Sequence, residues 1–197
     1  MAFLEEFSQD DRVRLVTLPY RVGLWVSTSD SAGGHAADQQ EVDALEVTIT
    51  RIAQGLFESA FVHEVIAETF LNKSQWPQWS GNIAAVPDEC LAAVHSLQGK
   101  LPQRDIDAYR HILMQVGLEV ARAFREYDKG APIGVRLLRG FSMMIDRLFG
   151  IIHGEKFVSD DILNISYEED IALNKLAQVL RGDVEDGTKA VGVIVNS

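Results

Sequence analysis

A short helical pattern occurs twice in this chain, and the repeat constrains the fold more than any other feature. Segment 22–26 reads Val-Gly-Leu-Trp-Val, and segment 116–120 reads Val-Gly-Leu-Glu-Val. Further along, segment 38–45 (Asp-Gln-Gln-Glu-Val-Asp-Ala-Leu) is matched by segment 166–173 (Ser-Tyr-Glu-Glu-Asp-Ile-Ala-Leu). Because both pairs occur in the same order, they indicate a repeated pair of helices. We therefore predict a fold built from two pseudo-symmetric halves.

Apolar residues recur at intervals of three and four along most of the chain, which is the spacing of helices that bury one face. Before residue 183 no segment sustains the alternation of a strand, so we predict an all-α bundle of about seven helices. The predicted helices cover 8–29 (kinked or restarted at Pro19), 38–56, 57–70, 87–98, 102–129, 136–152 and 166–181. Segments 27–37 and 72–86 are expected to be a loop and an irregular connection.

The length of 197 residues suits one large domain. We expect a single helical domain over 1–182. The tail, 183–197, is polar and then briefly strand-like, so we expect it to be flexible or to form a strand with a partner.

Charge and composition exclude several classes of protein. The net charge of −11 disfavours binding to nucleic acid and to anionic membrane surfaces. Cys90 is the only cysteine, so an intrachain disulfide and a four-thiolate zinc site are both excluded. Neither a secretory signal nor an apolar run of the ~20 residues that span a bilayer occurs, so we predict no membrane insertion and a cytoplasmic location.

The segment Leu18–Val26 (LPYRVGLWV), followed by Ser29-Asp30, Gly33-Gly34, Glu41 and Ala44-Leu45, resembles the tellurite-resistance TerB-like family. That family is all-helical, with two similar halves that each hold a helix, an acidic glycine-containing loop and a second helix. The resemblance implies a role in resistance to tellurite or related chemical stress. It also implies divalent-cation binding at the acidic loop and action through protein partners at the membrane face.

The candidate metal ligands are Asp30, Asp38 and Glu41, which flank the loop 27–37. If the loop folds back, their oxygens could converge on a hard cation, and calcium is favoured because it takes several oxygen ligands at flexible geometry. The alternative is that Asp38 and Glu41 form a capping box while Asp30 is a solvated loop residue. The sequence leaves both interpretations open.

Other residues that could carry chemistry have simpler structural interpretations. The five histidines are scattered without metal-ligand spacing, and Cys90 is expected to be a small buried hydrophobe. Trp76 and Trp79 are expected to plug the end of the bundle, although they could anchor a partner. Helix 136–152 is expected to be central in the bundle rather than a surface membrane helix.

No catalytic constellation is visible, so we predict a protein that is not an enzyme. The leading hypothesis is a cytoplasmic stress-response module that binds a divalent cation and a protein partner. The alternative is a metal-free helical interaction scaffold or oligomerisation module, in which the repeats are purely architectural.

Overall fold

The computed structural model describes residues 2–30, 39–53, 55, 58–127 and 167–182. Within this part of the chain there are seven α-helices and no strand, which confirms the all-α prediction. The α-helices are α1 (Gln9–Ser27), α2 (Gln39–Ala53), α3 (Ala60–Leu71), α4 (Trp76–Trp79), α5 (Val86–Leu97), α6 (Gln103–Tyr127) and α8 (Tyr167–Arg181). Short 3-10 helices are η1 (Phe3–Glu6), η2 (Thr28–Asp30), η3 (Lys73–Gln75) and η4 (Ile83–Ala85).

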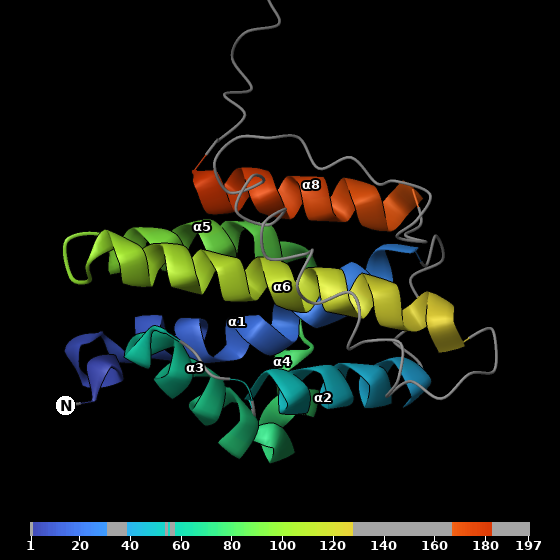
Figure 1. The fold of residues 1–197 in the computed structure, drawn as a ribbon, viewed down its shortest axis with the longest axis horizontal. Helices are drawn as coiled ribbons and strands as arrows, with labels where there is room; N and C mark the ends of the chain where they lie inside the picture. The colour runs from blue at the N-terminus through green and yellow to red at the C-terminus, as the bar shows by residue number, and fades with distance from the viewer. Residues whose placement is uncertain (1, 31–38, 54, 56–57, 128–166, 183–197) are drawn as a thin grey trace, which may run out of the picture.

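The helices are stacked in layers around α1, as Figure 1 shows. Helix α8 covers α5 and α6, α1 packs beneath these two, and α2 and α3 lie on the far side of α1. From Leu15 to Leu24 every residue of α1 is buried, so this helix is the centre of the described core. A helix that is apolar nearly all round is stable only when other helices cover it on several sides.

The two glycines of the repeated pattern lie where helices approach closely. A Cβ atom on Gly23 would overlap Leu45 Cδ1 of α2 and would lie 3.3 Å from Val116 and from Val120 of α6. A Cβ atom on Gly117 would lie 3.2 Å from Leu176 and 3.3 Å from Leu173 of α8, and 3.3 Å from Val26 of α1. Each glycine therefore allows one helix to pack against two others, and Leu45 and Leu173 occupy the same position in the two sequence repeats.

Local signals set most helix ends as expected. The Ser8 hydroxyl accepts a hydrogen bond from the Asp11 N–H at 3.2 Å and donates one to the Asp11 carboxylate at 2.8 Å, and this contact lowers the pKa of Asp11. Pro87 lies in the first turn of α5, and Gly99, with φ of +74°, follows that helix. Two expectations were wrong: α2 ends at Ala53, and 72–86 contains three short helices.

Pro19 neither ends nor restarts α1, which runs unbroken from Gln9 to Ser27. A proline has no N–H, so the Leu15 carbonyl four residues earlier loses its usual helical donor. The Tyr109 hydroxyl of α6 donates a hydrogen bond of 3.0 Å to this carbonyl, and both groups are buried. The neighbouring Val16 carbonyl accepts a further bond, at 2.7 Å, from the Thr69 hydroxyl of α3. The Tyr109 contact thus satisfies the carbonyl that Pro19 leaves without a helical donor.

This arrangement predicts that Tyr109→Phe destabilises the fold by about 1–3 kcal/mol, because the Leu15 carbonyl would be buried without a donor. Pro19→Ala should reduce that loss, since alanine restores the helical N–H. Urea unfolding of the two single variants and the double variant measures the coupling. Additive losses would contradict this account of Pro19.

Several sequence-based expectations lie outside the described residues. They are residues 31–37 of the loop expected over 27–37, the helix 136–152 and the tail 183–197. The end of the long helix expected over 102–129 also lies there, although α6 is described to Tyr127.

Candidate functional site

The proposed cation ligands flank the connection between α1 and α2. Asp30 ends η2 directly after α1, and Glu41 lies in the first turn of α2, but the side chains of both are outside the described set. Asp38 itself lies outside the described residues. The structure therefore gives the backbone position of two of the three candidates and no carboxylate geometry.

The backbone nevertheless shows where the end of α1 lies relative to the start of α2. Gly23 of α1 packs against Leu45 of α2, so these residues lie at one level of the helix pair. Asp30 follows Gly23 by seven residues and Asp38 precedes Leu45 by seven residues. Helix α2 runs back along α1 (Figure 1), so Asp30 after α1 and Gln39 at the start of α2 lie at the same end of the helix pair.

Elsewhere in the described part of the chain, no group of three or more His, Cys, Asp or Glu side chains could hold a metal ion. Cys90 is fully buried, as expected, and burial raises the pKa of its thiol far above the usual range. A thiol in this environment is not a nucleophile at neutral pH. Among the described helices, none combines the length and the apolar character needed to cross a membrane.

Arg21, which is buried in the middle of α1, makes five hydrogen bonds to other described residues. Its Nε and one terminal nitrogen donate to the Glu89 carboxylate at 2.8 and 3.0 Å. The remaining bonds go to the carbonyls of Trp79, Gly81 (2.8 Å) and Asn82 (3.2 Å). All five guanidinium donors are therefore used, and Arg21 fixes the segment between α4 and α5 against α1.

The two tryptophans of this segment have different environments. Trp76 is 3% exposed, stacks on Tyr20 with ring centres 4.9 Å apart, and donates its indole N–H to the Thr69 carbonyl at 3.0 Å. Trp76 is therefore buried, as expected. Trp79 packs edge-on against Tyr20 at 6.2 Å but remains partly exposed.

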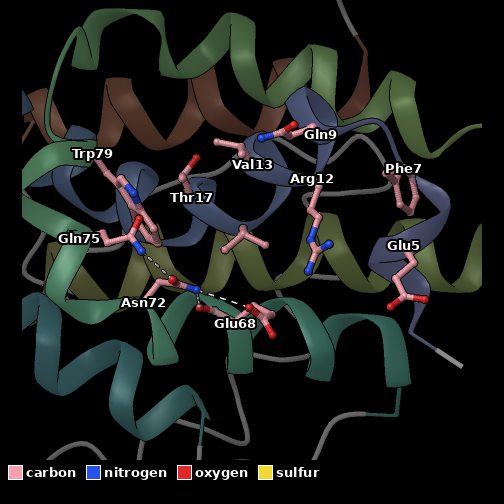
Figure 2. A pocket seen from close by; sticks show the side chains of 11 residues that line it. Glu5, Phe7, Gln9, Arg12, Val13, Thr17, Glu68, Asn72, Gln75 and Trp79 are labelled. Carbon is pink, nitrogen blue, oxygen red and sulfur yellow. Dashed lines mark hydrogen bonds between the residues drawn. The ribbon is translucent and has the colours of Figure 1, made fainter.

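Trp79 forms one end of a groove along the outer face of α1 (Figure 2). A cavity of about 570 Å³ extends from Trp79 along α1 to Glu5 and Phe7 near η1, and α3 and η3 supply its other wall. A second cavity of about 300 Å³ adjoins it on the α5 side. Both cavities are lined by Val13, Thr17 and Trp79, so they form one groove.

The walls of the groove are held by specific bonds. The Glu64 carboxylate of α3 accepts hydrogen bonds from the N–H groups of Phe3 (2.7 Å) and Leu4 (3.2 Å), which anchors η1 on α3. Asn72 donates to the Glu68 carbonyl at 2.8 Å and accepts from Gln75 at 2.9 Å, which orders the opposite wall. A groove with ordered walls can bind a ligand without first losing the entropy of its own loops.

Sequence reasoning missed both Arg21 as a structural centre and the groove. One signal was present for Arg21, because a single arginine within the apolar run Leu15–Val26 must be buried and paired. No comparable signal existed for the groove, because its lining comes from η1, α1, α3, η3, α4 and α5.

Comparison with family models, with curated proteins and with solved structures gave no match for this chain.

Proposed function

We propose that this protein is a non-enzymatic stress-response module of the tellurite-resistance TerB-like type. In this proposal it binds a divalent cation, calcium in the first instance, through Asp30, Asp38 and Glu41, and it acts through a protein partner. The resemblance of segment 18–45 to that family suggests the role.

The observation that carries the cation proposal is the equal spacing of Asp30 and Asp38 from the Gly23–Leu45 contact. Residues equally far from a contact between two antiparallel helices lie at the same end of the pair. Asp30 and the start of α2 lie at one end of the helix pair, and Asp38 directly precedes α2 in the sequence. In the proposal these two aspartates and Glu41 supply the several oxygens that calcium requires.

The same proposal includes duplicated halves, of which α1–α2 and α6–α8 are the central helix pairs. Its support is the matched packing of the repeats, since Gly23 contacts Leu45 and Gly117 contacts Leu173. In addition, Gly23 lies against two valines of the second repeat and Gly117 against one valine of the first.

Calorimetric titration with calcium tests the cation site. We expect saturable heat for the wild-type protein and none for Asp30→Ala, whereas Asp88→Ala, which removes an exposed acid of α5, should bind as the wild type does. Calcium at about 100 times its Kd should also stabilise the wild type by about 2.7 kcal/mol, because it binds only the folded state. Absence of heat for the wild type would end the cation proposal.

The second candidate function is a metal-free helical interaction scaffold, and the groove beside α1 favours it. The groove is preformed, and it carries exposed apolar and charged side chains that do not depend on a cation. An unchanged melting temperature on addition of calcium would support the scaffold over the cation module.

A further inference from the structure

The floor of the groove presents one exposed apolar side chain of α1, Val13, to solvent. Val13 is 54% exposed, which is unusual beside a helix that buries nearly every residue from Leu15 onward. Val16, one turn away, and Phe7, at the end of the groove, also line it, but both are buried in the core. An exposed valine in a preformed groove can contact an apolar side chain of a ligand.

Trp79 supplies a rigid anchor at the other end. Arg21 holds its backbone carbonyl and Tyr20 packs against its ring, yet part of the ring faces the groove. An aromatic side chain that is fixed before binding loses little entropy in the complex, and tryptophans of this kind dominate binding energy at protein interfaces.

The charged side chains of the groove indicate the sign of the charge that a partner would carry. The carboxylates of Glu5 and Asp10 form no hydrogen bond or ion pair with any described residue, and Glu68 has only a 3.4 Å contact with Asn72. Arg14 and Arg21 are already paired with Asp11 and Glu89. The groove therefore has three carboxylates without an ion-pair partner among the described residues. Arg12, which projects across the groove from α1 (Figure 2), supplies one positive charge against them.

We infer that this groove binds a basic amphipathic peptide segment of a partner protein. Its apolar side chains pack on Val13 and Trp79, and its lysines or arginines pair with Glu5, Asp10 and Glu68. The net charge of −11 adds long-range attraction for such a segment. The inference rests on the partner-binding part of the proposed function. It places the partner on the N-terminal half of α1, whereas the proposed cation hairpin is at the C-terminal end.

The test uses a fluorescein-labelled helical peptide of leucine and lysine, about 14 residues or roughly 20 Å long, and measures fluorescence anisotropy against the full chain at about 150 mM salt. We expect saturable binding with a Kd of about 10 µM. Val13→Ser should weaken binding about fivefold and Glu5→Lys about tenfold, because each removes one of the two kinds of contact.

Two matched variants serve as controls. Val47→Ser removes a valine of equal exposure (52%) on α2, and Glu168→Lys reverses an exposed acid in the first turn of α8. Both should bind within about twofold of the wild type. Equal losses in the groove and control variants, equal binding of a leucine–glutamate peptide, or no saturation would overturn the inference. Absence of heat in the calcium titration would contradict the cation site alone, because Val13 and Glu5 lie at the other end of α1.

Discussion

Arg21→Lys is expected to destabilise the protein by about 2–4 kcal/mol, although the substitution keeps the positive charge. A lysine has three donors on one nitrogen and cannot reach both Glu89 oxygens and the carbonyls of Trp79, Gly81 and Asn82. At least two of these five acceptors would then lose their arginine donor. Urea unfolding monitored by circular dichroism measures the change.

Arg14→Lys is the matched control, because Arg14 lies two turns earlier on α1 and pairs only with Asp11 at 2.6 Å. A local ion pair of this kind contributes little, so a loss below about 0.5 kcal/mol is expected. Similar losses of unfolding free energy for the two substitutions would show that the five hydrogen bonds of Arg21 do not stabilise the α4–α5 segment. Because Trp79 depends on the same bonds, Arg21→Lys should also weaken binding of the basic peptide.

Gly23→Val is expected to destabilise the protein by about 3 kcal/mol or more. The new side chain has three carbons, and its first would already overlap Leu45 and press on Val116 and Val120. Leu45→Ala alone should cost about 2–5 kcal/mol, because it leaves a cavity in the core.

The double variant Gly23→Val/Leu45→Ala should be more stable than the sum of its single losses by about 1–2 kcal/mol, since three carbons are added where three are removed. Combining Gly117→Val with Leu45→Ala is the control, because Leu45 is not among the near neighbours of Gly117. Unfolding experiments should give additive losses for that pair. Equal coupling in both double variants would contradict the packing described around Gly23.

Most helix positions could be predicted from the sequence because their causes are local. Ser8, Pro87 and Gly99 act on the backbone within a few residues, so their effects do not depend on the rest of the fold. The segment 72–86 was harder, because its short helices are held in place by Arg21 and by Trp76 packing on Tyr20. Contacts between residues about 60 positions apart leave no periodic pattern in the segment itself.

The candidate cation ligands could also be suggested from the sequence, whereas the groove could not. The sequence suggested Asp30, Asp38 and Glu41 through a repeat and a family resemblance, and these three residues remain a prediction. The groove could not be predicted, because Glu5, Val13 and Trp79 become neighbours only when η1, α1 and α4 are assembled.

The sequence by itself determined that this chain is helical, where most of its helices begin and end, and which two glycines recur. It did so because capping and periodicity are short-range properties of the backbone. Only the tertiary structure decided how α1 tolerates Pro19, where Arg21 finds five acceptors, and which surface of α1 stays uncovered. Each of these depends on groups brought together from distant parts of the chain, as with the Tyr109 hydroxyl on the Leu15 carbonyl.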